Sequence, residues 1–168
     1  GLGSLTEQIG GLISGIEYGQ IQVSGNVNLA GNLFVGLING FRPILNHEFL
    51  IILNQSGGAI NGTFYGLPEG STVWSDVYGF ELSYAGGDGY DLTLKVTQSP
   101  IVIWDGNTDG DGDGISWSDA LNWANDTLPG LNDDVVIGSG FTVAHADAVT
   151  STVRSIESHS PLTLSGGT

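Results

Sequence analysis

The chain has 168 residues, and its 18 acidic side chains against three basic ones give a formal net charge of −15. This balance argues against a nucleic-acid binder, which needs a basic face, and against binding to anionic membrane surfaces. It favours an extracellular, cation-rich setting in which divalent ions neutralise clustered carboxylates.

Hydrophobic residues make up 40% of the chain, which is enough for a core, and the 28 glycines favour many short strands and tight turns. Cysteine is absent, which excludes disulfides and thiol chemistry. The longest apolar run falls far short of the roughly 20 residues of a membrane span, and no signal peptide is visible. Methionine is also absent, which indicates a processed chain or an excerpt from a longer one.

Residues 9–35 alternate between apolar and polar side chains, and a period of two predicts short strands. Gly25 and Gly31, each beside an asparagine, interrupt this pattern at a spacing of about six residues, which is too short for ordinary hairpins and suits the corners of a β-solenoid. Residues 41–49 look like a corner or excursion. Further strands are expected at residues 49–53, up to Phe64 after a turn, and at residues 72–74, 78–84 and 90–96, the last two joined by a hairpin turn.

Residues 101–134 differ from the rest of the chain. They hold eight of the 18 acidic residues and three of the four tryptophans, with no lysine or arginine. Calcium takes six to eight oxygen ligands, and acidic or amide side chains at alternate positions with glycines between them can wrap one ion. We therefore predict a calcium site made of Asp105, Asn107, Asp109, Asp111, Asp113 and Asp119.

An EF-hand proper is not expected, because counting from Asp109 places Ala120 where that loop needs a glutamate. An isolated calcium loop, completed by Asp119, Asp133 or Asp134, fits better. The alternative is a solvated, flexible acidic linker. Flexible linkers rarely carry tryptophan, so the three tryptophans of the segment favour the calcium loop.

The tryptophans allow two interpretations. Trp104, Trp117 and Trp123 form either a carbohydrate-stacking platform or a plug in the core of the segment, and we favour the plug because aromatic side chains dominate such packing. Residues 118–123 form the only helical candidate, a single turn with Ser116 or Ser118 as its cap. Beyond it, strands are expected at residues 134–137, 141–145, 151–156 and 162–164.

Signals for an enzyme are weak, and we predict that the chain is not one. The three histidines are far apart, so a zinc site is not expected, and no nucleophile elbow is present. Paired carboxylates, Asp133 with Asp134 or Asp88 with Asp91, would allow glycoside chemistry in a polysaccharide-active enzyme fragment. That remains a third interpretation, because only three basic residues are available to assist such acids.

With these motifs in view, the chain resembles tandem β-solenoid modules of large bacterial cell-surface proteins, of the autotransporter-like and adhesin-like kind found in planctomycete-type giant repeat proteins. The likeness implies a right-handed parallel β-helix and a structural or adhesive role, with no catalytic residue. Its first block looks like closing coils (residues 24–27, 62–64, 66–70 and 84–94). Its second block looks like the opening of the next solenoid (residues 104–106, 117–119, 122–123, 128–130 and 132–137).

We therefore expect an all-β chain of parallel β-solenoid segments: closing coils over residues 1–98, an Asp/Trp-rich calcium joint over 99–136, and opening strands of the next solenoid over 137–168. A β-sandwich is the alternative for residues 20–98. The expected function is that of a structural module of a secreted or cell-surface fibrous protein. Both chain ends look like cut faces, so copies or adjacent modules would stack end to end into a filament or array. The alternative function is a carbohydrate-binding adhesin module that contacts surface glycans.

Overall fold

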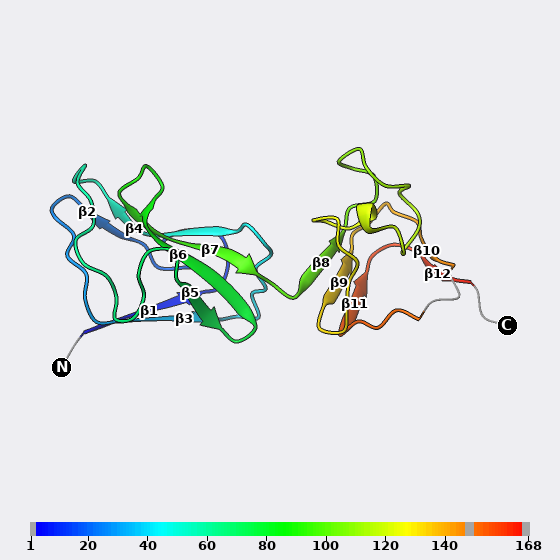
Figure 1. The fold of residues 1–168 in the computed structure, drawn as a ribbon, viewed down its shortest axis with the longest axis horizontal. Coiled ribbons are helices and arrows are strands. Elements are labelled where there is room, and N and C mark those ends of the chain that lie inside the picture. The colour runs from blue at the N-terminus through cyan, green and yellow to red at the C-terminus, as the bar shows by residue number, and fades with distance from the viewer. Residues whose placement is uncertain (1–2, 147–149, 166–168) are drawn as a thin grey trace. The chain divides into compact units, whose positions relative to one another are not determined.

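The computed structural model describes residues 3–146 and 150–165. Over these residues the chain forms twelve strands and one short 3-10 turn, so the prediction of an all-β fold is confirmed. The chain divides into two compact units, residues 1–99 and 100–168, each with a hydrophobic core of its own (Figure 1). Among the described residues, no helix is long and apolar enough to cross a membrane.

The first unit contains a two-stranded sheet, in the order β1-β3, and a five-stranded sheet, in the order β2-β4-β7-β6-β5. Side chains alternate along β6 and β7, and one row of apolar residues, Phe80, Leu82, Leu92, Leu94 and Val96, lies in the core. The strands are β1 (Ser4–Ile9), β2 (Ile21–Val23), β3 (Asn32–Leu37), β4 (Glu48–Asn54), β5 (Thr72–Ser75), β6 (Tyr78–Gly86) and β7 (Asp91–Gln98).

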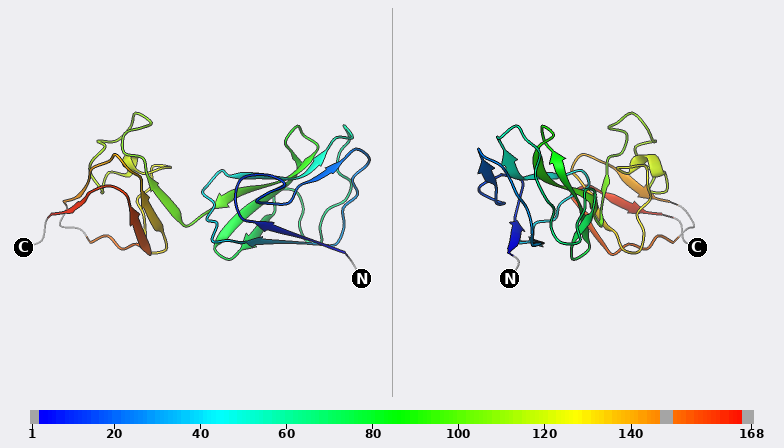
Figure 2. Two further views of the ribbon diagram at one scale, coloured as in Figure 1. Left: turned by 180° about the vertical axis from the view of Figure 1, so that it is seen from behind. Right: turned by 60° about the vertical axis from the view of Figure 1, so that its left-hand side comes forward.

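Two successive passes of the chain run parallel in this unit. β1 pairs with β3, β2 pairs with β4, and an isolated parallel bridge joins Asn28 to Asn61. Figure 2 shows β1 alongside β3 from further directions. Beyond the second pass the pairing changes, because β7 lies antiparallel to β4, and β6 and β5 follow it as antiparallel neighbours.

Two predicted strands of the first unit are wrong. The strand expected to continue through residues 9–16 ends at Ile9, because the Glu17 carboxylate accepts hydrogen bonds from the backbone N–H groups of Leu12 (2.8 Å) and Ile13 (2.9 Å) and bends the chain there. The strand expected before Phe64 is absent from the described strands. Phe64 instead donates its N–H to the Tyr84 hydroxyl at 3.0 Å.

The second unit contains a three-stranded sheet, in the order β11-β9-β8, and a two-stranded sheet, in the order β10-β12. Both are parallel throughout. A single 3-10 turn (Ala120–Asn122) lies between β8 and β9. The strands are β8 (Ile101–Trp104), β9 (Asp134–Ile137), β10 (Val143–His145), β11 (Ser155–Ser158) and β12 (Leu162–Leu164).

Three passes of the chain lie over one another in this unit, at two separate places. At one location, β8, β9 and β11 lie side by side: Ile101 pairs with Asp134, and Asp134 pairs with Ser155. At the other location, Ser116 pairs with Ala144 of β10, and Ala144 pairs with Thr163 of β12. The aspartate-rich run is therefore the connection between the two places in the first pass. The second pass makes the same connection with residues 138–142 only.

The predicted division of the chain differs from the observed one. The structure divides it once, between Ser99 and Pro100, and residues 100–136 of the expected joint belong to the second unit. The sheets are small and mixed, and over the described residues they do not form a closed solenoid. The strand expected at residues 151–156 begins only at Ser155. The expected helical turn is a 3-10 turn whose cap is Asp119 rather than Ser116 or Ser118.

Candidate functional site

Asn122, which was not among the predicted ligands, organises the aspartate-rich segment. Its side chain is fully buried. Its Nδ2 donates to the Asp113 carboxylate and to the Ser116 carbonyl, both at 2.8 Å, and its Oδ1 accepts from the Gly114 N–H at 2.7 Å. One amide thus joins the end of the aspartate run to the 3-10 turn.

The close approach of the loop to Asn122 also explains why residue 112 is a glycine. Gly112 has φ +75°, and a Cβ at this position would lie 2.3 Å from Asn122 Oδ1. Only a residue without a side chain allows the loop to approach the amide so closely. Gly110, with φ +99°, faces open space instead.

Asp113, a predicted calcium ligand, is held by hydrogen bonds from its own loop. It accepts from the Ser116 hydroxyl and from the N–H groups of Ser116 (2.7 Å) and Ile115 (2.8 Å), besides the amide of Asn122. These bonds, those from Ser116 first, hold the pKa of this carboxyl well below its usual range. Asp113 is therefore an ionised brace of the loop.

Asp119 has a similar structural role. It precedes the 3-10 turn, and its Oδ1 accepts from the Leu121 N–H at 3.1 Å, which is the usual contact of a capping residue. Its Oδ2 accepts from the Asp113 N–H at 3.0 Å. Asp119 and Asp113 thus lie close together, as the predicted calcium site requires, but both carboxylates are already hydrogen-bonded.

Asp105 lies at the start of the run, where a second group of acids meets. Its Oδ1 is buried and has no hydrogen-bond partner among the described residues. Burial raises the pKa of Asp105, and the negative charges of Asp109 and Asp126 raise it further. Asp126, which lies far along the sequence from Asp109, was not among the predicted ligands.

The remaining predicted ligands are exposed. Asp109 accepts a hydrogen bond from the N–H of Asp111 at 3.2 Å. Asn107 lies close to Gly114: a Cβ added to this glycine would be 3.4 Å from the Cβ of Asn107. In the described part of the chain, no group of three or more His, Cys, Asp or Glu side chains has the arrangement of a metal site. The predicted ligands thus form two groups, one around Asp105 and one around Asp113.

Asp133 and Asp134, considered as additional ligands, have other partners. Asp133 accepts from the Gly130 N–H at 2.8 Å within a turn. Asp134 is buried and accepts from Arg154 Nε at 2.8 Å, from Arg154 Nη2 and from the Ser155 hydroxyl at 2.6 Å. This ion pair fastens the second pass of the unit to the third.

The three tryptophans of the segment fill the core of the second unit. All are buried, and the Trp123 ring meets the rings of Trp104 and Trp117 edge to face, with centroids 4.8 and 4.7 Å apart. Trp123 Nε1 also donates to the Trp117 carbonyl at 2.8 Å. The predicted plug is therefore confirmed, and burial excludes a carbohydrate-stacking platform made of these rings.

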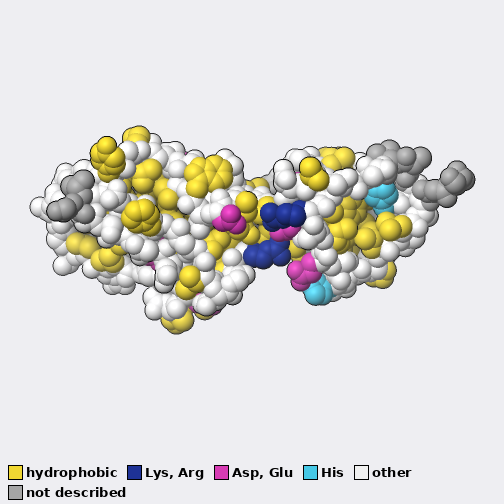
Figure 3. All heavy atoms as spheres, turned by 90° about the horizontal axis from the view of Figure 1, so that it is seen from below, with side chains coloured by type: hydrophobic (Ala, Val, Ile, Leu, Met, Phe, Trp, Pro, Cys, Tyr) yellow, Lys and Arg dark blue, Asp and Glu magenta, His cyan; other side chains and the backbone are white. Residues whose placement is uncertain are grey.

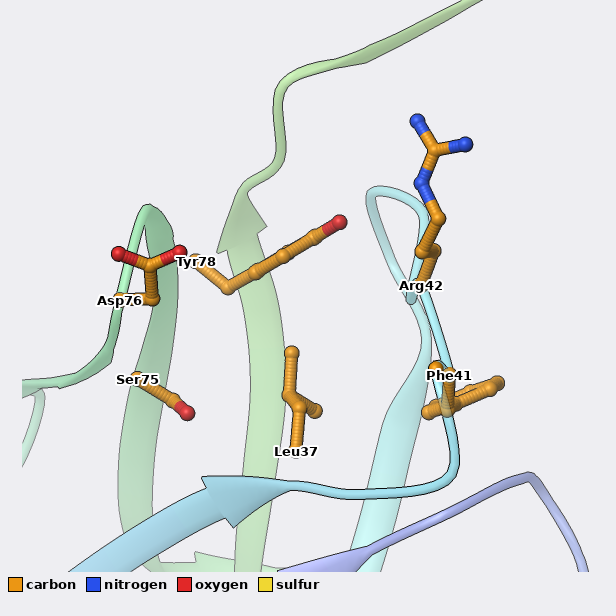
Figure 4. Close-up of a pocket in the computed structure, with 7 residues that line it drawn as sticks. Leu37, Phe41, Arg42, Ser75, Asp76 and Tyr78 are labelled. Carbon is orange, nitrogen blue, oxygen red and sulfur yellow. The ribbon is translucent and has the colours of Figure 1, made fainter.

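A separate pocket of about 340 Å³ lies in the first unit (Figure 4). Leu37 and Phe41 give it apolar walls, while Ser75, Asp76 and Tyr78 from the β5–β6 hairpin line its other side. No residue of the aspartate-rich segment lines this pocket. The acidic pair Asp88 and Asp91 is not part of it either: Asp91 is buried and accepts from the Asn54 N–H at 2.7 Å, which is a structural bond.

No protein-family model matches the chain, and comparisons with curated proteins and with solved structures gave no significant match.

Proposed function

We propose that the chain is a structural module of a secreted or cell-surface fibrous protein, built from stacked parallel coils and stiffened by calcium. One observation carries the proposal: three successive passes pair in parallel at two places in the second unit. This is the pairing pattern of a β-solenoid, in which each coil contacts only its neighbours. Nearly all such crossover connections are right-handed, so the coils would form a right-handed β-helix.

The first unit supports the same proposal, because it has the features of the closing end of a solenoid. Beside its parallel strands lie the antiparallel strands β7, β6 and β5, of which β7 pairs with β4. Antiparallel strands of this kind would close a solenoid, because they occupy the edge that a further parallel coil would need. The chain would then contain the end of one solenoid and the beginning of another.

Over the face drawn in Figure 3 most of the surface is uncharged, and apolar side chains are scattered over both units. With a net charge of −15, neighbouring modules would repel one another unless cations intervened. The proposal places the chain outside the cell, among neighbouring modules or copies of itself, and assigns it no catalytic role.

Calcium is the proposed cation, held by the aspartate-rich segment. Two observations support a cation near Asp105: its buried Oδ1 has no hydrogen-bond partner within the part of the chain that the structure describes, and the charges of Asp109 and Asp126 act on it. Asn107 and Asp111 contribute further exposed oxygens, while Asp113 and Asp119 hold the loop in place for it. A bound Ca²⁺ would stabilise the folded second unit, because it neutralises carboxylates that otherwise repel one another.

Addition of 10 mM CaCl₂ is expected to raise the melting temperature of the second unit, and EDTA is expected to reverse the rise. Extracellular calcium sites have dissociation constants of roughly 10⁻⁴–10⁻³ M, so the expected stabilisation is about 1.4–2.7 kcal/mol. Scanning calorimetry at matched ionic strength measures it, with MgCl₂ as the control for charge screening.

Paired variants locate the site. Asp105→Asn with Asp109→Asn should abolish the calcium-dependent rise, while Asp88→Asn, an exposed acid of the first unit, should leave it intact. A melting temperature that calcium and EDTA do not change in the unaltered chain would refute the calcium part of the proposal.

A further inference from the structure

The pocket of the first unit lies between two walls that come from different strands. One wall follows β3, in which Leu37 is the last residue and beyond which Phe41 lies. The other wall is the β5–β6 hairpin, with Ser75, Asp76 and Tyr78. Figure 4 shows Ser75 and Asp76 on one side of the pocket and Phe41 on the other. The volume of about 340 Å³ is at the lower end of the range for small-molecule sites, about 300–1,000 Å³, so the pocket suits a ligand of one ring.

The fold holds both walls in place without a ligand. After β3, Asn39 and Gly40 adopt left-handed conformations, with φ of 56° and 70°. The Phe41 N–H then donates to the Ile38 carbonyl at 3.0 Å, which closes the turn. The Phe41 ring stacks on His47, with the two rings 5° from parallel and their centroids 6.4 Å apart. Antiparallel pairing of β5 with β6 fixes the opposite wall. A preformed site costs a ligand less conformational entropy than one that must be ordered on binding.

The lining combines apolar surface with hydroxyl groups. Leu37 and the rings of Phe41 and Tyr78 supply the apolar surface. Ser75 and Tyr78 carry hydroxyls, which both donate and accept hydrogen bonds, and the Asp76 carboxylate accepts them. A ligand that matches this lining has an apolar face and several polar groups that donate as well as accept.

Charge disfavours an ionic ligand. Arg42 and Asp76 both line the pocket, so an anion meets the carboxylate and a cation meets the guanidinium. The net charge of −15 also opposes an anion. A cation would gain little from Asp76, because this side chain is exposed and exposed ion pairs contribute little. A cation also brings hydrogen-bond donors alone, which leaves the hydroxyl hydrogens of Ser75 and Tyr78 without an acceptor on the ligand.

We propose that this pocket binds one neutral sugar ring, a pyranose residue of a glycan. The C–H face of a pyranose lies against Leu37 and the aromatic rings, whose negative faces attract it. Its hydroxyls donate to the Asp76 carboxylate, which accepts stronger hydrogen bonds than a neutral group, and exchange hydrogen bonds with Ser75. Glycan binding is a further activity beside the proposed structural role, at a site that shares no residue with the aspartate-rich segment.

Titration of the full chain with methyl glycosides of glucose, galactose, mannose and N-acetylglucosamine, followed in ¹H–¹⁵N correlation spectra, tests the proposal. At least one glycoside is expected to shift the amide signals of Gly40, Ser75 and Asp76 saturably, with a dissociation constant of roughly 1–10 mM for a ligand of this size. Butylammonium chloride and sodium acetate at matched ionic strength probe a cation and an anion, and both should shift these signals less.

Two variants locate the site. Asp76→Asn should weaken binding at least about tenfold, because it removes the charged acceptor, and asparagine tolerates the left-handed φ of 54° at this position. Ser75→Phe fills the pocket and should abolish the shifts. Asp88→Asn is the matched control, because Asp88 is an exposed acid of the first unit that does not line the pocket, and it should bind as the unaltered chain does. The dispersion of each spectrum checks that the variant is folded.

Three outcomes would overturn the inference. The first is that none of the four glycosides shifts the pocket signals. The second is a stronger response to butylammonium or acetate than to every glycoside. The third is an Asp76→Asn variant that binds as tightly as the Asp88→Asn control. In each case a retained calcium-dependent stabilisation of the second unit leaves the proposed structural function standing.

Discussion

Replacement of Trp123 by alanine is expected to destabilise the second unit by about 3–5 kcal/mol, the usual cost of removing a large buried aromatic side chain. The ring is fully buried, meets two further tryptophans edge to face and donates a hydrogen bond to the Trp117 carbonyl. Folded proteins hold only roughly 0.05–0.15 kcal/mol per residue, so this loss is comparable with the total stability of a unit of this size.

Scanning calorimetry and ¹H–¹⁵N correlation spectra measure the effect. The dispersed signals of residues 100–168 should collapse, and the transition of the second unit should shift far down or disappear. Trp74→Ala is the control, because Trp74 is an exposed tryptophan of the first unit, and its loss should change stability by no more than about 0.5 kcal/mol. A Trp123→Ala variant as stable as the control would contradict the assignment of the three tryptophans to a core.

The second large effect is expected at Asn122. Asn122→Ala removes the acceptor of the Gly114 N–H and the donor to the Ser116 carbonyl, and it deprives Asp113 of one hydrogen bond. Buried or partly buried backbone groups that lose their partners cost about 1–3 kcal/mol each, so the expected destabilisation is roughly 2–4 kcal/mol. Chemical denaturation of the second unit, followed by circular dichroism, measures it.

Two further variants make this test specific. Asn107→Ala removes an exposed amide of the same loop and should cost little in the absence of calcium. Asn122→Asp keeps an acceptor for Gly114 but places a second carboxylate against Asp113, so it should be no more stable than Asn122→Ala at neutral pH. Equal stability of Asn107→Ala and Asn122→Ala would show that the amide does not organise the loop.

Patterns in the sequence predicted those strands whose burial follows directly from the local order of apolar and polar residues. The apolar run around Phe49–Leu53 forms β4, and the alternation over residues 78–84 and 90–96 forms β6 and β7 with a hairpin turn between them. Burial on one or both faces of a strand leaves a direct trace in the order of residues. The same trace identified β9 and β12 in the second unit.

The parts that sequence patterns missed depend on contacts between distant residues. Ile101–Trp104 was assigned to the joint, but its pairing with β9 makes it the first strand of the second unit. The carboxylate of Glu17 ends a predicted strand by accepting two backbone N–H groups. Neither contact follows from the local period of apolar residues, because each depends on which segment of the chain lies opposite.

In the aspartate-rich segment, too, sequence patterns did not reveal the contacts between distant residues. Its composition predicted the tryptophan core and identified the loop, but it did not distinguish the roles of the six predicted ligands. Hydrogen bonds hold Asp113 and Asp119, which brace the loop through Asn122 and the 3-10 turn, whereas the charges of Asp109 and Asp126 raise the pKa of Asp105. A side chain that bonds residues eight or nine positions away leaves no periodic signal.

We expect the aspartate-rich segment to be a rigid part of the second unit and not a flexible linker. Hydrogen–deuterium exchange of backbone amides tests it most directly. The amides of Gly114, Ser116 and Trp117, which donate to Asn122, Asp113 and the Ala144 carbonyl, should exchange slowly, together with those of β9. Exchange of these amides at the rate of an unstructured peptide, while β9 stays protected, would contradict the claim.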